Sequence, residues 1–420
     1  MANSQTSNYI PTLRFPTFQN VEEWKTKRLG DIFVRITDKN TENNQNVLTI
    51  SSQYGLVSQY DYFNKNVAAS DVKNYFLIRK GDFAYNKSRS QGYPFGAIKP
   101  LLLYEKGIVS PLYICFRLID IQSDVSFFQH YFEAGLINDG ISRIAQEGAR
   151  NHGLLNISTE DFFNIELRVP SINEQKSIAE CLSAIDEAIS EYNTKLELVK
   201  SHKNGLMQKL FPAKGQKVPE LRFKEFGKDS EWKNLELGEI TIVVNRRNKS
   251  RRNLPIYSVN NKIGFIPQSE QFDGLDSESR GYDTSMYKIV GKHTFAYNPA
   301  RINVGSIGYS GDLKEVLISS LYVCFKTTED IDDGFLMCFF NTSQFNEAVE
   351  NNVEGGIRSY LFYENFSRIK ISIPSLSEQK KIASTLFSID NLIDFYAEKV
   401  SLLEEHKKGL MQQLFPRINK

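Results

Sequence analysis

The chain carries at residues 170–212 the sequence PSINEQKSIAECLSAIDEAISEYNTKLELVKSHKNGLMQKLFP and repeats it at residues 374–416 as PSLSEQKKIASTLFSIDNLIDFYAEKVSLLEEHKKGLMQQLFP. About half of the aligned positions are identical, a density that chance does not give. The chain therefore consists of two related halves, and each half ends in the same element.

This repeated element has the pattern of a long helix. Ser171 with Glu174, and Ser375 with Glu378, match the capping box that begins a helix, and a proline closes each copy. A helix of roughly 37 residues would be about 55 Å long. Apolar residues follow at alternating steps of four and three, which is the heptad seam of a coiled coil. The seam consists of Ile178, Leu182, Ile185, Ile189, Tyr192, Leu196 and Val199, then Ile382, Leu386, Ile389, Ile393, Tyr396, Val400 and Leu403.

The two helices are natural partners, because a lone helix would leave its apolar seam in water. We predict an intramolecular coiled coil. The pairing is expected to be antiparallel, because a whole module lies between the helices and a pseudo-two-fold repeat then closes the structure. One lysine interrupts each seam, Lys203 in the first copy and Lys407 in the second.

Shorter repeats precede each helix. They are PTLRF (11–15) with PELRF (219–223), FAYN (83–86) with FAYN (295–298), and LYICF (112–116) with LYVCF (321–325). Between them the halves diverge, most clearly over residues 33–82 against 241–294. Trp24 and Trp232 follow the first repeat, and we expect them to pack in a core or interface and to take no part in catalysis.

The repeats divide the chain into two variable modules, each followed by a long helix. The boundaries are a tail (1–12), the first module (13–169), the first helix (170–212), a linker (213–218), the second module (219–373), the second helix (374–416) and a tail (417–420). Runs of aromatic and β-branched residues predict strands, and hence a mixed α/β (α+β) fold for each module. The expected strands are 47–51, 75–79, 82–86 and 108–118, then 254–259, 286–290, 294–298 and 316–326, with helices at 126–134 and 334–349.

Three kinds of loop carry residues suited to DNA. Arginine, asparagine and glutamine offer paired contacts to base edges, while serine and basic side chains bind phosphates. The loops are the segments after each FAYN, the basic run NRRNKSRRN (245–253), and the glycine-flanked arginines of GARNHG (148–153) and GGIRSY (355–360). A basic run is also typical of an ordinary solvated loop. The candidate residues are Asn86, Lys87, Ser88, Arg89, Gln91, Arg150, Asn151, Arg246, Arg247, Lys249, Arg251, Arg252, Asn298, Arg301, Asn303, Arg358 and Ser359.

Composition and missing motifs narrow the function. The net charge is +1, so a DNA-binding chain would have to concentrate its basic residues locally. The sequence has no GxxxxGK[ST] loop, no strand followed by GxGxxG, and no His/Cys metal spacing. We therefore expect no catalytic residue, metal or cofactor in this chain. The four cysteines lack CxxC spacing, and no long apolar stretch is present, which predicts buried free thiols in a cytoplasmic protein that does not span a membrane.

The arrangement resembles the specificity subunit of type I restriction–modification enzymes. The resemblance covers residues 11–416 and is carried by the duplicated sequences IPSLSEQKKIA and GLMQQLFP and by PELRF…EW…LGEI. It implies that each module is a target-recognition domain for one half of a bipartite, asymmetric DNA site. It also implies that the helices set the gap between the half-sites.

The resemblance further implies partners. Two methyltransferase subunits would bring S-adenosylmethionine and methylate adenine, and two motor/nuclease subunits would use ATP and Mg²⁺. The alternative from the residues alone is a tandem-domain scaffold that binds protein and uses the coiled coil as a spacer.

Overall fold

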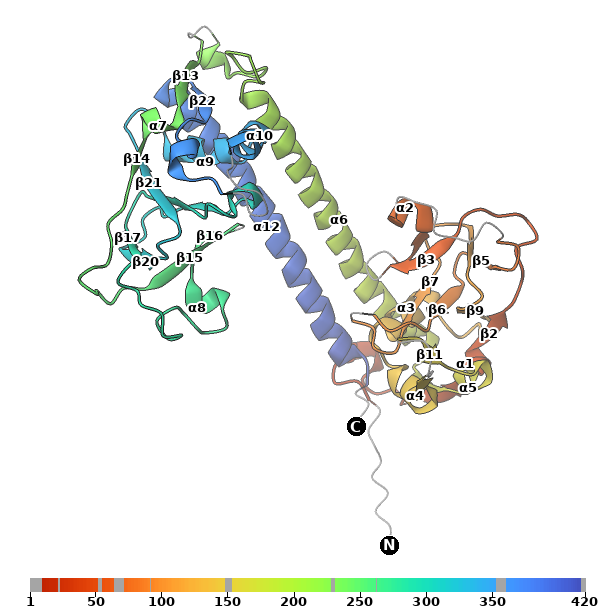
Figure 1. Ribbon diagram of the computed structural model, residues 1–420. Coiled ribbons are helices and arrows are strands. Elements are labelled where there is room, and N and C mark those ends of the chain that lie inside the picture. The colour runs from red at the N-terminus through yellow and green to blue at the C-terminus, as the bar shows by residue number, and fades with distance from the viewer. Residues whose placement is uncertain are drawn as a thin grey trace. The chain divides into compact units, whose positions relative to one another are not determined.

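The long helices of the computed structural model begin and end close to the predicted residues (Figure 1). Helix α6 spans Ile172–Leu210 and helix α12 spans Leu376–Leu414, and each has 39 residues. None of the predicted seam residues is exposed. The structure describes residues 10–21, 23–51, 55–63, 72–90, 92–147, 153–227, 231–261, 263–352 and 360–416.

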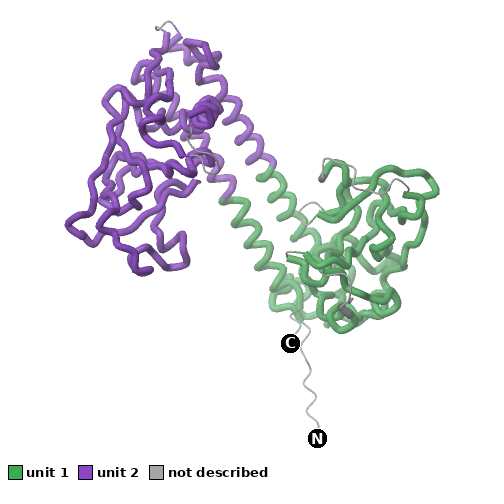
Figure 2. The backbone as a smooth tube through the Cα atoms, viewed as in Figure 1, with its two compact units in different colours: residues 1–193, 398–420 green, residues 194–397 purple. Residues whose placement is uncertain are grey.

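The chain divides into two compact units (Figure 2), and each unit contains one module together with part of both helices. Unit 1 comprises residues 1–193 and 398–420, and unit 2 comprises residues 194–397. In unit 1, Leu182 near the beginning of α6 shares a core with Leu414 at the end of α12. In unit 2, Leu210 and Leu386 share a core in the same way. The two helices therefore run antiparallel, as the sequence predicts.

The lysines that interrupt the seams bind the opposite helix. Lys407 Nζ lies 2.7 Å from the carboxylate of Asp186 in unit 1, and Lys203 forms the corresponding ion pair with Asp390 in unit 2. Each polar position in the seam thus has a charged partner, and the pairing has the same pattern in both units.

Each module is built on a four-stranded antiparallel sheet, with the order β2-β9-β6-β7 in unit 1 and β14-β21-β18-β19 in unit 2. The strands are β2 (Phe33–Ile36), β6 (Phe83–Asn86), β7 (Ala97–Pro100) and β9 (Ile114–Leu118), then β14 (Thr241–Val243), β18 (Phe295–Tyr297), β19 (Ile307–Tyr309) and β21 (Val323–Thr327). The repeated FAYN and LYICF/LYVCF segments supply the two central strands of each sheet, and the diverged segments add the edge strands β2 and β14 in the same positions.

Further strands complete each module. In unit 2 they form a second sheet with the order β16-β15-β20-β17, and in unit 1 their counterparts form the pairs β3-β4 and β5-β8. These strands are β3 (Leu48–Ser51), β4 (Gly55–Ser58), β5 (Phe76–Arg79) and β8 (Lys106–Val109), then β15 (Ile256–Asn260), β16 (Gly264–Pro267), β17 (Lys288–Val290) and β20 (Val316–Ile318). The pairs β1-β12, β10-β11 and β13-β22 are formed by β1 (Lys25–Arg28), β10 (Gln146–Glu147), β11 (Leu155–Asn156), β12 (Glu166–Val169), β13 (Lys233–Glu236) and β22 (Lys370–Ile373).

Helices pack against these sheets. Those of unit 1 are α1 (Leu29–Ile32), α2 (Gln59–Phe63), α3 (Val125–Glu133), α4 (Asn138–Ile144) and α5 (Thr159–Phe163). Those of unit 2 are α7 (Leu237–Ile240), α8 (Gln268–Gln271), α9 (Asp333–Phe340), α10 (Ser343–Asn352) and α11 (Tyr363–Phe366). Short 3₁₀ turns occur at Pro16–Phe18, Lys224–Phe226 and Ile302–Val304. Among the described residues, no helix is both long enough and apolar enough to cross a membrane.

Three predicted elements are wrong in extent. The strand expected at 108–118 is two strands, β8 and β9, separated by a turn in which Tyr113 N donates to the carbonyl of Ser110. The strand expected at 316–326 divides in the same way, with Tyr322 N donating to Ser319. The helix expected at 334–349 breaks into α9 and α10, because the Thr342 hydroxyl accepts from Phe345 N at 3.2 Å and begins a new helix.

The tryptophans lie in the cores, as predicted. Trp24 and Trp232 are each 3% exposed. Trp24 contacts Phe415, just after α12, with ring centroids 6.2 Å apart, and Trp232 contacts Phe211, just after α6, at 6.3 Å. The core of each module thus includes the end of the helix that follows the other module in sequence.

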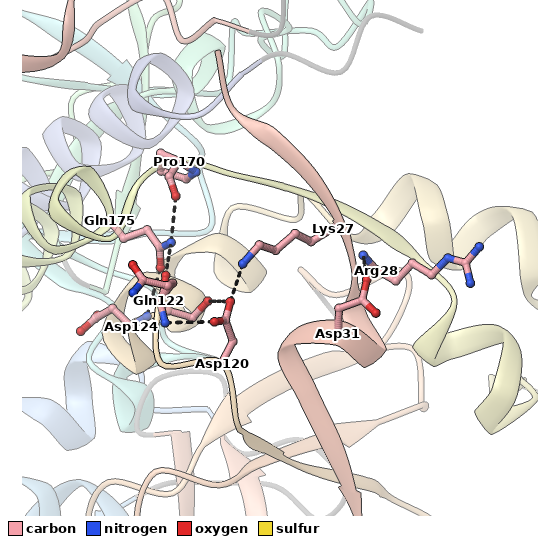
Figure 3. A network of polar contacts seen from close by, with 9 residues as sticks. Lys27, Arg28, Asp31, Asp120, Gln122, Asp124, Pro170 and Gln175 are labelled. Atoms are coloured by element: carbon pink, nitrogen blue, oxygen red, sulfur yellow. Dashed lines mark hydrogen bonds and ion pairs between the residues drawn. The ribbon is translucent and has the colours of Figure 1, made fainter. Parts of the chain in front are cut away.

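A glutamine that occurs at the beginning of both long helices fixes each helix to its module, as Figure 3 shows for Gln175. The Gln175 side chain is 1% exposed. Its carbonyl accepts from Asp124 N at 3.0 Å, and its amide donates to the carbonyls of Gln122 at 3.1 Å and Pro170 at 3.0 Å. Asp124 in turn caps α3 by accepting from Phe127 N at 2.8 Å.

The second half repeats this network. Gln379 accepts from Asp332 N at 2.8 Å and donates to Asp330 and Pro374 at 3.1 Å. Asp332 caps α9 just as Asp124 caps α3. The helix begins in the same way in both halves because the same buried amide joins three backbone groups.

Half of each predicted capping box is present. Ser171 Oγ accepts from Glu174 N at 3.4 Å. The Glu174 carboxylate, however, forms a bidentate ion pair with the Arg14 guanidinium at 2.7 Å, and both side chains are buried. Arg222 and Glu378 make the equivalent pair. The LRF repeats therefore supply an arginine to the helix, and the expected return contact of the glutamate is replaced by an ion pair.

Candidate nucleic-acid interface

One end of the main sheet carries the loop that follows FAYN in each module, and in unit 2 it also carries the basic run. Strands β2 and β6 are both antiparallel to β9, so they are parallel to each other. The segments that follow them, residues 37–47 and 87–96, therefore leave the sheet at the same end. In unit 2, β14 and β18 are both antiparallel to β21, so the segments after them share an end by the same argument.

In unit 1 the structure brings two of the predicted loops together. The Arg89 N–H donates to the carbonyl of Gly153 at 2.7 Å, and the Lys87 carbonyl accepts from Leu155 N at 3.1 Å. The loop after β6 thus lies beside the residues that follow the GARNH segment. Ser88 and Arg89 are exposed, whereas Asn86 and Lys87 are half-buried. Gln91, Arg150 and Asn151 lie outside the described residues.

Asn86 and Lys87 are partly engaged by the protein. The Asn86 amide donates to the Tyr113 hydroxyl at 3.3 Å, and its carbonyl accepts from Ser88 N at 3.0 Å. Burial lowers the pKa of Lys87, so a nearby anion such as a phosphate would stabilise its charged form. Asn86 therefore shapes the loop, and the exposed candidates are the residues after it.

The corresponding loop of unit 2 has the same neighbours. The Pro299 carbonyl accepts from Leu361 N at 3.0 Å. The Asn298 side chain accepts from Ala300 N at 3.0 Å and so shapes the loop, as Asn86 does in unit 1. Arg301 and Asn303 are exposed. Arg358 and Ser359 lie outside the described residues.

The basic run of unit 2 is divided between paired and outward side chains. Arg246 and Arg252 both bind the carboxylate of Glu315, at 2.5 and 2.6 Å, and these hydrogen bonds lower the pKa of Glu315. Lys249 and Arg251 lie at the tip of the same loop and are exposed. We infer that the tip residues offer more charge to DNA than the two arginines held by Glu315.

A cavity of about 400 Å³ lies next to this loop. Its lining includes Asn245, which immediately precedes the basic run, with Lys288, Phe362 and Asn365. Phe362 is 52% exposed, and its ring stacks on that of Tyr360 at a centroid distance of 5.7 Å with an interplanar angle of 6°. The cavity thus connects the basic loop with the segment beside Pro299.

Sequence reasoning missed Lys288 and the aromatic pair. Lys288 comes from β17, in a segment predicted only as a strand, and its ammonium donates to the Tyr322 carbonyl at 2.7 Å. The exposure of Phe362 gives no periodic signal in the sequence, because it lies in an irregular connection before α11.

A second polar cluster lies in unit 1, where α3 meets both long helices. Ligand atoms of His130, Glu133 and Asp186 lie within 4.8 Å of one another. The Lys407 ammonium, however, lies 2.7 Å from Asp186 and 3.4 Å from Glu133, and Lys99 lies 3.8 Å from Glu133. A lysine charge therefore occupies the position between the carboxylates that a metal ion would need.

His130 is fully buried in this cluster. Burial, and then the charge of Lys407, lower the pKa of His130 to about 4, so the imidazole is neutral near pH 7. Unit 2 has the equivalent Lys203–Asp390 pair but has Cys338 at the position of His130. These two positions are equivalent because His130 and Cys338 are each the sixth residue after the aspartate that caps their helix. The cluster is thus best explained as a charge-balanced contact between helices.

The cysteines are free. Cys115, Cys324 and Cys338 are buried and Cys181 is half-buried. Burial raises the pKa of Cys115 and of Cys324 to about 12, so these thiols are not activated as nucleophiles.

Comparison with known proteins connects this architecture with one family. A family profile described as the type I restriction modification DNA specificity domain matches residues 21–200 and again residues 229–405. Among curated proteins of Methanocaldococcus jannaschii, the putative type I restriction enzyme MjaX specificity subunit is 23% identical, and the alignment covers 94% of this chain and 93% of that protein. The type I restriction enzyme MjaVIII specificity subunit is 24% identical over 94% of this chain and 92% of its own length.

Solved structures share the fold. The S subunit of a type I restriction–modification system from M. genitalium superimposes with a TM-score of 0.58 at 16% identity, covering 98% of this chain and 100% of that one. A chain from a study of complex assembly and conformational transition in the type I R-M system gives a TM-score of 0.52 at 16% identity, covering 94% of this chain and 98% of that one.

Proposed function

The chain belongs to the family of type I restriction–modification DNA specificity subunits, and from this premise we propose that its two modules recognise the two halves of one bipartite, asymmetric DNA site. Members of this family recognise DNA and are not catalysts. The finer assignment concerns which part of the chain binds which part of the site and what the bound complex then does.

The observation that carries this proposal is the repetition of one sheet with different loops. Both modules present loops at the same end of an equivalent sheet. The two ends share an exposed arginine, Arg89 in unit 1 and Arg301 in unit 2, but they differ beside it, because unit 2 has Ala300 at the position of Ser88. Because base edges are distinguished by the donors and acceptors that meet them, two such surfaces would recognise two different sequences.

The long helices supply the constant part of the proposed complex. At 1.5 Å per residue, a 39-residue helix is about 58 Å long, which is enough to keep two recognition surfaces on separate turns of DNA. We propose that the helices set the gap between the half-sites. We also propose that the two helices, in which about half of the aligned positions are identical, bind two identical methyltransferase subunits.

The chemistry is assigned to these partners. The methyltransferase subunits would carry S-adenosylmethionine and methylate adenine. Two motor/nuclease subunits with ATP and Mg²⁺ would cleave unmodified DNA. The chain itself would supply only recognition and no cofactor site.

The test is long-read mapping of adenine methylation in cells that express this chain with its cognate methyltransferase subunit, compared with cells that lack this chain. We expect a bipartite, asymmetric motif that appears only with the chain. An assembled complex that gives no such motif would overturn the proposal and favour a protein-binding scaffold.

A further inference from the structure

The diverged segments after β2 and β14 form the same turn. In unit 1 the Asn40 side chain, 3% exposed, donates to the carbonyl of Asn44 at 2.9 Å and accepts from Asn44 N at 2.8 Å. In unit 2 the Asn248 side chain, 0% exposed, makes the same two bonds with Arg252 at 3.0 and 2.8 Å. A buried asparagine thus closes a five-residue loop in both modules.

The two turns also agree in their attachment and in their backbone. Asn40 N donates to the Tyr75 carbonyl at 3.0 Å, and Asn248 N donates to the Tyr287 carbonyl at 2.9 Å. The residue just before the end of each turn is left-handed, with φ of 53° at Asn43 and 49° at Arg251. These two residues therefore occupy equivalent corners, and both are exposed.

The turns differ in charge. Residues 245–253 contain five basic side chains and no acid, giving +5, whereas residues 37–45 contain Lys39 against Asp38 and Glu42, giving −1. Glu42 is exposed and binds Lys106 at 2.7 Å. The turn of unit 1 therefore offers a phosphate far less positive charge than the turn of unit 2.

The uncharged side chains of the unit 1 turn have a different use. Thr41, Asn43 and Gln45 are exposed there, and asparagine, glutamine and threonine are residues that hydrogen-bond to base edges in the major groove. This turn leaves the sheet at the same end as the loop of Ser88 and Arg89, because β2 and β6 are parallel.

We propose that this asparagine-closed turn contacts DNA in both modules but performs a different task in each. The turn of unit 2 binds the phosphate backbone through Lys249 and Arg251. The turn of unit 1 contacts base edges through Thr41 and Asn43. The inference rests on the proposed function, and it gives the two turns different roles. The turn of unit 2 makes salt-dependent contacts that are independent of sequence, and the turn of unit 1 contributes to sequence recognition.

The experiment replaces each corner residue by glycine, which adopts a positive φ without strain and so removes the side chain while keeping the turn. The variants are Asn43→Gly and Arg251→Gly. The matched control is His293→Gly. His293 is also exposed and left-handed, with φ of 53°, but it precedes β18 and so lies at the opposite end of the sheet. Unit 1 already has a left-handed glycine, Gly81, before β6.

Each variant is assembled with the cognate methyltransferase subunit. Its methylated motif is mapped, and its affinity for a duplex that carries the wild-type motif is measured over a series of salt concentrations. Asn43→Gly should lower discrimination at a base pair of one half-site by about 5- to 150-fold, with the slope of log K against log salt unchanged. That half-site should be the one altered when residues 33–160 are exchanged.

Arg251→Gly should leave both half-sites unchanged and reduce the magnitude of the salt slope by about 0.9, the contribution of one phosphate contact. His293→Gly should change neither. An unchanged motif with Asn43→Gly, or an altered base preference with Arg251→Gly, would overturn the inference. Absence of a motif from the unmodified complex would instead refute the proposed function, so the two failures are distinguishable.

Discussion

The buried amide at the beginning of α6 is expected to stabilise unit 1 alone. Gln175→Ala removes a side chain that makes three hydrogen bonds of 3.0, 3.1 and 3.0 Å to backbone groups of Asp124, Gln122 and Pro170. At about 1 kcal/mol for each bond, the loss is about 3 kcal/mol, and backbone groups left without a partner add to it. Against a typical total of about 5–15 kcal/mol, this is a large fraction.

The two tryptophans allow the effect to be localised. The chain contains two tryptophans, Trp24 in the core of unit 1 and Trp232 in the core of unit 2. In a Trp232→Phe background the remaining fluorescence reports unit 1, and in a Trp24→Phe background it reports unit 2. Urea unfolding of Gln175→Ala in both backgrounds therefore gives one transition for each unit.

We expect the transition reported by Trp24 to move to a lower urea concentration, corresponding to a loss of about 3 kcal/mol in the free energy of unfolding. The transition reported by Trp232 should not move. The control is Gln412→Ala, which removes an exposed glutamine from the same unit and should change stability by less than about 0.5 kcal/mol. Equal shifts of both transitions, or a shift no larger than that of the control, would refute the reasoning that the Gln175 amide stabilises unit 1 alone.

Three further predictions concern the cluster in unit 1 and the proposed function. The pKa of His130 falls from 6.5 to about 4 on folding, so the unfolded state binds more protons than the folded state between these pH values. The free energy of unfolding of unit 1 should therefore decrease by up to about 3 kcal/mol as the pH falls through this window. Urea unfolding followed by Trp24 tests this, and His130→Cys, which copies Cys338 of unit 2, should remove most of the pH dependence. Insertion of about four residues lengthens α6 by about 6 Å. Methylation mapping should then show a gap between the half-sites that is longer by about two base pairs, at about 3.4 Å for each base pair. An unchanged gap would contradict the spacer role. Exchange of residues 33–160 for another module should alter one half-site only, and alteration of both would contradict modular recognition.

The sequence predicts the architecture well because the architecture is repeated. The heptad steps define α6 and α12, and the duplicated frame predicts two modules of one fold, which the structure and the family comparison confirm. The turn between β8 and β9 was missed because Ser110 and Pro111, which favour a turn, were included in one strand-forming run. The periodicity of apolar residues indicates which residues are buried and not where the chain reverses, so it does not reveal a turn between two buried strands.

The candidate DNA residues were harder to predict, because a loop's chemistry does not reveal its neighbours. The structure places Arg89 beside Gly153 and shows that Arg246 and Arg252 are held by Glu315, contacts that no spacing indicates. Whether the predicted residues touch bases stays a prediction. The asparagine-closed turn was missed because Asn40 and Asn248 are its only shared side chain and the exposed positions around them differ.

That pattern separates two kinds of residue within one duplicated frame. Two side chains that satisfy buried backbone groups are the same in both halves: Gln175 matches Gln379, and Asn40 matches Asn248. Removing such a side chain leaves buried polar groups without partners, which lowers the stability of the fold whatever sequence the module recognises. Exposed loop residues carry no such cost, and they can change from an acidic turn to a basic one without disturbing the sheet beneath. A chain built in this way can change the exposed loops of one module while the helices and the other module keep their structure.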